Sequence, residues 1–74
     1  MGKCQSEIRE VRFVIEDGLT ECYVLVGAMG DCPIGVQGWH HKTFPASQSA
    51  LDILGSSAFR DYLLWPQESP NPAN

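Results

Sequence analysis

Hydrophobic and polar residues alternate in two neighbouring segments near the start of the chain, residues 7–16 (EIREVRFVIE) and residues 21–26 (ECYVLV). A β-strand places successive side chains on opposite faces of its sheet, so an apolar residue at every second position marks a half-buried strand. The pattern therefore predicts two strands. Their buried faces consist of Val11, Phe13, Ile15, Cys22, Val24 and Val26.

The segment between these strands contains Asp17-Gly18, a dipeptide typical of tight β-hairpin turns. Two registers fit the pattern. A two-residue loop places Phe13 opposite Cys22 and Val11 opposite Val24, whereas a four-residue loop places Phe13 opposite Val24. The two registers differ by two residues, so the same face is buried in both.

Glycine and proline dominate residues 27–38 (GAMGDCPIGVQG), which predicts a loop. A third strand is expected at roughly residues 35–44. Trp39 and Phe44 fall on opposite faces of that strand, so we expect one of them to be buried and the other to be partly exposed.

A helix is predicted after Pro45, beginning near Ser47 or Ser49, because Ser49 and Asp52 form a capping pattern. Apolar residues then recur at helical spacing until Pro66. Gly55 interrupts this stripe, and the helix is expected to kink or split there. The stripe consists of Leu51, Leu54, Gly55, Ala58, Phe59, Tyr62 and Leu63.

These elements predict an α+β fold, in which a small antiparallel sheet (the hairpin plus the third strand) is covered on one face by a C-terminal helix that is kinked or split near Gly55. A chain of 74 residues has room for one core. We expect a single domain over residues 1–66 and a disordered tail over residues 67–74, which is rich in Pro and Asn.

The chain carries a net charge of −4, and its five basic residues are scattered. Nucleic acids and anionic membranes attract clustered Lys and Arg, so neither is an expected partner. The polar N-terminal segment resembles no export signal, which favours a cytoplasmic location. In that compartment Cys4, Cys22 and Cys32 are expected to be reduced thiols.

The histidines and cysteines suggest a reactive or metal-binding site around Cys32, His40 and His41, with Cys22 and Asp31 as further ligands. Two observations argue against it: no Cys-x-x-Cys pair is present, and adjacent strand residues point to opposite faces. The glycine-rich loop lacks the spacing of a phosphate-binding motif. We therefore expect no catalytic residues, no resident metal and no cofactor, although the sequence does not decide whether the protein is an enzyme.

Several large apolar residues lie off the predicted core faces, among them Val14, Tyr23, Leu25, Ile53, Leu64 and Trp65. The leading hypothesis is therefore a non-enzymatic module that binds a protein, and a homodimer and a different partner stay equally open. The alternative is a thiol- or metal-dependent small-molecule site at Cys32, His40 and His41. The residues expected to bind the partner are Trp39, His40, His41, Phe44, Leu64 and Trp65.

Overall fold

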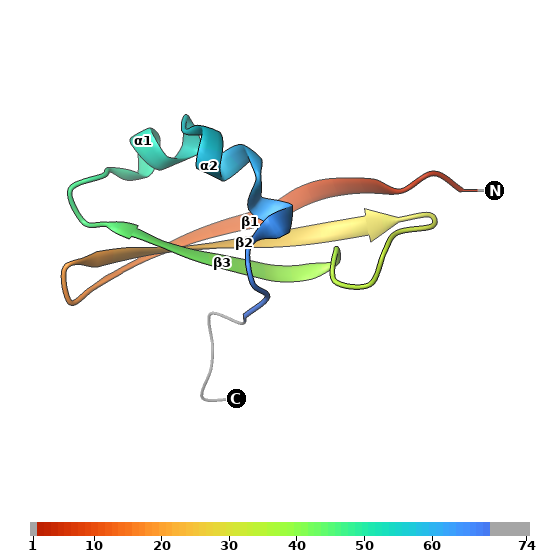
Figure 1. Ribbon diagram of the computed structural model, residues 1–74, viewed down its shortest axis with the longest axis horizontal. Coiled ribbons are helices and arrows are strands. Elements are labelled where there is room, and N and C mark those ends of the chain that lie inside the picture. The colour runs from red at the N-terminus through yellow and green to blue at the C-terminus, as the bar shows by residue number, and fades with distance from the viewer. Residues whose placement is uncertain (1, 69–74) are drawn as a thin grey trace.

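The computed structural model describes residues 2–68 and shows a small mixed α+β domain (Figure 1). Three antiparallel strands, β1 (Gln5–Glu16), β2 (Leu19–Met29) and β3 (Gly38–Pro45), form one sheet in the order β1-β2-β3. The short helices α1 (Ala50–Leu54) and α2 (Ser57–Arg60) and the 3₁₀ turn η1 (Tyr62–Leu64) follow. Among the described residues, no helix is long and apolar enough to cross a membrane.

The hairpin of β1 and β2 has the two-residue loop. Phe13 lies opposite Cys22 and Val11 opposite Val24, which confirms the first of the two registers. Asp17 and Gly18 have φ values of 50° and 76°, and a type I′ turn requires positive φ at both central positions.

A bulge at Arg9 interrupts the pairing of β1 with β2, between the pairs Ile8–Val26 and Glu10–Leu25. Gly27 makes room for it, because a Cβ atom there would lie 2.1 Å from the Arg9 Nε. A bulge adds one residue to a strand and shifts its alternation. As a result, Ile8 lies on the same face of β1 as Val11 and Phe13.

The third strand begins later than expected and ends at Pro45. After η1 the chain returns to the outer edge of β3, where the His41 N–H donates to the Pro66 carbonyl (2.9 Å) and the Glu68 N–H donates to the Trp39 carbonyl (3.0 Å). Gln67 and Glu68, which the sequence assigned to a disordered tail, are thus paired with β3. The rest of that tail, residues 69–74, lies outside the described residues.

The C-terminal helix expected to cover one face of the sheet is not confirmed; the helical structure splits at Gly55, as expected, but it forms three short segments. Gly55 ends α1, and the Ser56 side chain caps α2 by accepting from the Phe59 N–H. The capping box of Ser49 and Asp52 is present as expected.

The predicted helical stripe is wrong in part, because the break at Gly55 changes which side chains point inward. Leu51 is 81% exposed, and Leu54 and Leu63 are also exposed, whereas Ile53 and Trp65 are buried. A periodicity that extends over a break does not describe one helix face.

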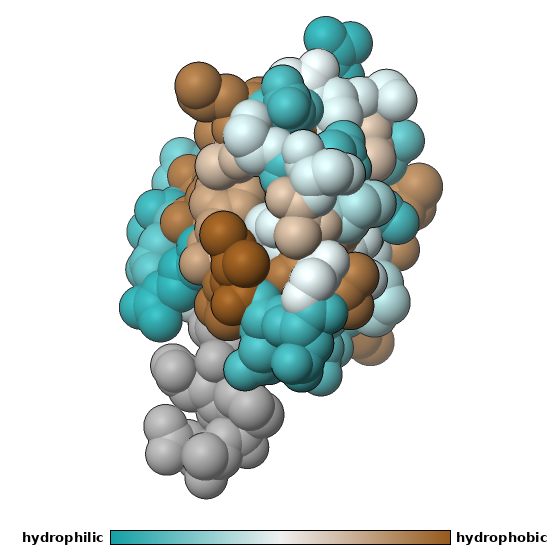
Figure 2. Space-filling model, turned by 90° about the vertical axis from the view of Figure 1, so that its left-hand side faces the viewer, coloured by the Kyte–Doolittle hydropathy of each residue, from teal (hydrophilic) through white to brown (hydrophobic). Residues whose placement is uncertain are grey.

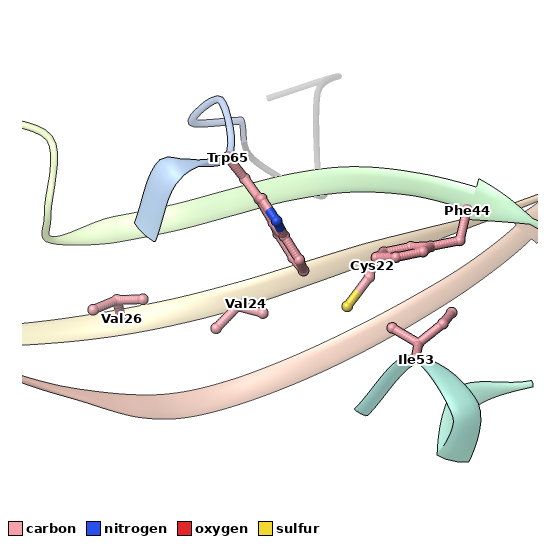
Figure 3. Close-up of a cluster of buried hydrophobic side chains, with 6 residues drawn as sticks. All are labelled: Cys22, Val24, Val26, Phe44, Ile53 and Trp65. Carbon is pink, nitrogen blue, oxygen red and sulfur yellow. The ribbon is translucent and has the colours of Figure 1, made fainter. Parts of the chain in front are cut away.

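The core lies between these helical segments and one face of the sheet (Figure 3). Ile53 reaches in from α1 toward Phe44 and Cys22, and the Trp65 ring contacts Phe44 edge-on, with ring centroids 5.9 Å apart. Val11 and Phe13 of β1 pack against this cluster only in part, and Ile15 is 76% exposed. The core is therefore well closed over β2 and β3, and less so over β1.

Cys4 and Cys32 form a disulfide, with Cα atoms 4.6 Å apart, so the expectation of three reduced thiols is wrong for two of them. The pairing of Gln5 with Met29 places Cys4 at the open end of the hairpin, and the loop after Gly30 brings Cys32 back to it. The third cysteine, Cys22, is free and buried.

Candidate interaction surfaces

The two outer edges of the sheet differ in what covers them. Residues 66–68 pair with the first half of β3, whereas no described segment pairs with the outer edge of β1. In a two-residue hairpin, the turn hydrogen bond joins Glu16 and Leu19, and hydrogen-bonded pairs then alternate along the ladder. The backbone N–H and C=O groups of Val11, Phe13 and Ile15 therefore face the open side.

Apolar side chains line this open edge on the core side of the sheet. Ile8 and Ile15 are exposed, and Val11 and Phe13 are only half-buried. Figure 2 views the end of the molecule that carries the hairpin turn and shows hydrophobic side chains at the surface among hydrophilic ones. Leu19, Leu51 and Leu54 add exposed apolar surface in the β2 and α1 segments.

The opposite face of β1 carries charges of both signs. Arg12 pairs with Glu10, two residues earlier, and its guanidinium lies 5.6 Å from the centre of the Trp39 ring. Arg9 pairs with Glu7 at 3.6 Å. Such exposed ion pairs contribute little to the stability of a monomer. They do determine the order of positive and negative side chains that a strand pairing with β1 would meet.

A polar cluster joins β2, β3 and the returning chain on that same face. His41 stacks on Tyr23, with ring centroids 4.5 Å apart, and its two ring nitrogens lie 3.0 Å from a Glu21 oxygen and 2.7 Å from a Glu68 oxygen. The Tyr23 hydroxyl donates to Glu21 (3.1 Å). Burial, followed by Glu21, raises the pKa of the Tyr23 phenol. The cluster holds residue 68 against the edge of β3.

A groove of about 580 Å³ continues along the edge of β3 beyond this point, and its walls include Thr43, Leu64 and Pro66. Pro66 has no N–H, so it cannot donate a main-chain hydrogen bond to β3. Leu64, one of the residues expected to bind a partner, is 83% exposed here.

The other residues expected to bind a partner have different surroundings. Phe44 and Trp65 belong to the core, and Trp39 is half-buried, as expected for one of the pair Trp39 and Phe44. His40 is fully buried, with its Nδ1 3.3 Å from the Trp65 carbonyl and its Nε2 2.8 Å from the Val36 carbonyl. His40 therefore connects the loop before β3 to the chain after η1.

The structure does not assemble the proposed site of Cys32, His40 and His41. Cys32 is bonded to Cys4, and the two histidines point to opposite faces of β3, as expected for neighbours in a strand. Within residues 2–68, no group of three or more His, Cys, Asp or Glu side chains is arranged to hold a metal ion. Burial raises the pKa of the Cys22 thiol to about 11, which disfavours a reactive thiolate.

Sequence reasoning missed the row formed by Ile8, Val11, Phe13 and Ile15 as a candidate surface and assigned three of its residues to the core. The alternation was read correctly, but it does not say that β1 lies at an edge of the sheet. The bulge that brings Ile8 into the row has one sequence signal, Gly27, which makes room for Arg9.

No protein-family model, curated protein or solved structure matches this chain. Its function must therefore be argued from its own surfaces.

Proposed function

We propose that this protein is a non-enzymatic interaction module that associates with itself by antiparallel pairing of two β1 strands. The observation that carries the proposal is the 12-residue strand β1, whose outer edge no described segment covers and whose core-side face leaves apolar surface exposed. Long open edges readily accept another strand, and a symmetric dimer is the commonest assembly.

The charges on β1 select one register, in which a two-fold axis passes between Val11 and its counterpart in the second copy. Glu10 then lies opposite Arg12 of the second copy, and Arg12 opposite Glu10, on the same face of the joined sheet. A register centred on Phe13 would instead place Glu10 opposite Glu16. Opposite charges across a ladder are favourable and like charges are unfavourable, so the first register is preferred.

The same register continues the apolar row. The bulge at Arg9 takes up one residue of β1, so Ile8 of each copy lies opposite Phe13 of the other. These two pairs flank the central Val11 pair. The backbone N–H and C=O groups of Val11 face the open side of β1. The two Val11 residues at the axis therefore exchange two hydrogen bonds. The result is a six-stranded sheet whose half-open core is completed by side chains of the second copy.

Charged residues and bulges are also devices by which monomeric proteins prevent edge pairing. On β1, however, the charges alternate in sign, so a second antiparallel copy meets opposite charges instead of like ones.

The cytoplasmic location stays a prediction from the sequence, and a disulfide is uncommon in that compartment.

The charge register is tested by measuring the dimer dissociation constant by sedimentation equilibrium. Arg12→Glu should raise it roughly ten-fold, because two opposite-charge pairs become two like-charge pairs. The double variant Glu10→Arg/Arg12→Glu should restore most of the affinity. Both variants lose the contact of Arg12 with Trp39, so recovery is attributable to the charge pairs. Arg60→Glu, the same charge change on α2, is the matched control.

Hydrogen exchange provides a second readout, in which the amides of Val11 and Phe13 gain protection as the protein concentration rises. A wild-type protein that stays monomeric at several hundred micromolar would contradict the proposal. A dimer whose affinity is unaffected by Arg12→Glu would show that the contact lies elsewhere.

A further inference from the structure

The Cys4–Cys32 disulfide lies at the surface, where β1 begins and the loop between β2 and β3 turns back. Cys4 is exposed and Cys32 is half-buried. Gly30, with φ of 89°, allows a close approach, because a Cβ atom there would lie 2.0 Å from the Lys3 carbonyl oxygen. The Gly2 N–H also donates to the Asp31 carboxylate (3.1 Å). These two contacts hold residues 2 and 3 against residues 30 and 31, beside the disulfide.

A groove of about 470 Å³ opens beside Cys4, and its lining includes Ser6, Arg9 and Met29. Arg9 brings a guanidinium to this groove. Its partner there, Glu7, is 3.6 Å away and largely exposed, so the pair is weak and an incoming carboxylate can compete for Arg9. The lining therefore brings Cys4, the Arg9 guanidinium and the competing Glu7 carboxylate into one groove.

The third cysteine is excluded from this chemistry. Cys22 is fully buried in the core, and burial raises the pKa of its thiol to about 11, so near neutral pH it stays protonated and out of contact with solvent. Any thiol exchange in the native state is confined to Cys4 and Cys32.

We propose that Cys4, Cys32 and the adjoining groove form a thiol-exchange site for small thiols that carry a carboxylate. The thiolate of the small molecule attacks the Cys4 sulfur, a bond forms between these two sulfurs, and the Cys4–Cys32 bond breaks with its electron pair on Cys32. Water protonates Cys32, whose sulfur lies 3.4 Å from the Met29 carbonyl and can then donate to it. A second small thiolate attacks the small molecule's sulfur, which releases a small disulfide and leaves Cys4 reduced.

The site is tested with glutathione as the probe, a small thiol that carries carboxylates. In mixtures of reduced and oxidised glutathione under native conditions, intact-mass spectrometry should show the protein interconverting between its disulfide form and a form with two additional thiols. Cys32→Ser should trap one glutathione on Cys4. Cys4→Ser should take up glutathione on Cys32 roughly ten-fold more slowly, because exchange depends on access to the sulfur.

Arg9→Gln tests the role of the groove and should slow reduction by glutathione several-fold while leaving reduction by uncharged 2-mercaptoethanol unchanged. Circular dichroism confirms that each variant is folded. Reduction that occurs only in urea, or labelling of Cys32 as fast as Cys4, would overturn the site. Equal effects of Arg9→Gln on both reductants would overturn the preference for a carboxylate.

Discussion

The edges formed by β1 and β3 belong to one sheet and share β2 as their neighbour. The chain covers part of the β3 edge, whereas no described segment covers the β1 edge. Along β3, residues 66–68 supply main-chain hydrogen bonds, and the His41–Glu68 contact adds a side-chain attachment. Along β1, no described segment pairs with the backbone, and apolar side chains remain partly exposed.

This difference separates an edge that the chain itself covers from an edge that our proposal assigns to a second copy. Along β3, the C-terminal segment follows directly after Trp65, which is anchored in the core before Pro66, whereas β1 is followed by the hairpin turn. An open edge with an apolar row and self-complementary charges is suited to a second copy, whereas a covered edge is not.

The largest effect is expected from Trp65→Ala. The Trp65 ring packs against Phe44 and Phe59, and its indole N–H donates to the Ala58 carbonyl (3.2 Å). Removing a buried Trp side chain costs about 3–5 kcal/mol. In a domain of this size that loss lowers Tm by roughly 15–30 °C, which thermal unfolding monitored by circular dichroism will measure.

Leu64→Ala is the matched control for this change, because Leu64 is adjacent but 83% exposed. Its effect should stay within about 0.5 kcal/mol. Similar losses for the two variants would show that Trp65 does not anchor the chain over β3.

The next largest effect concerns the start of β1. Replacing Cys4 and Cys32 with Ser removes a cross-link between residues separated by 28 positions. By loop entropy this change destabilises the fold by about 3–4 kcal/mol. Urea denaturation measures the loss, and wild-type protein reduced under the same conditions should match the variant. A variant as stable as the oxidised wild type would contradict the stabilising role of the disulfide.

Much of the sheet could be predicted from sequence because its signals are local. The alternation of Val11 and Phe13, the Asp17-Gly18 turn and the opposite faces of Trp39 and Phe44 are each determined by neighbouring residues. The cap of α1 at Ser49 is local in the same sense.

What could not be predicted depends on contacts between distant segments. The bond between Cys4 and Cys32 depends on the hairpin register together with the return of the loop after Gly30. The burial of Trp65 depends on the chain turning back to β3, and the open edge of β1 depends on strand order. The candidate surface was missed for this last reason, because the same alternation describes an edge strand and a central strand.

A pH prediction concerns β2, the strand that both edges share. Burial raises the pKa of the folded Cys22 thiol from 9.0 to about 11, so the folded state holds that proton more tightly than the unfolded chain. The resulting stabilisation is present below pH 9 and is lost as the pH rises toward 11.

The free energy of unfolding should therefore fall by about 2–3 kcal/mol across this range, as urea denaturation at several pH values will show. Cys22→Ala should make this fall in the free energy of unfolding smaller. The fall that remains should come from Tyr23, whose pKa is also raised in the folded state. An unchanged slope in Cys22→Ala would assign the whole effect to other groups.

The smallest effect is expected from Glu68→Gln, which weakens the contact of Glu68 with His41 but keeps the main-chain pairing of residues 66–68. Because Glu68 is about half exposed, the loss should be below about 1 kcal/mol. It should appear locally, as a few-fold faster hydrogen exchange of the His41 amide. Glu7→Gln, which weakens a comparable exposed pair on β1, should leave that amide unchanged. If Glu68→Gln leaves it unchanged as well, main-chain pairing and the Trp65 anchor are sufficient to cover β3, and the difference between the two edges is one of chain path alone.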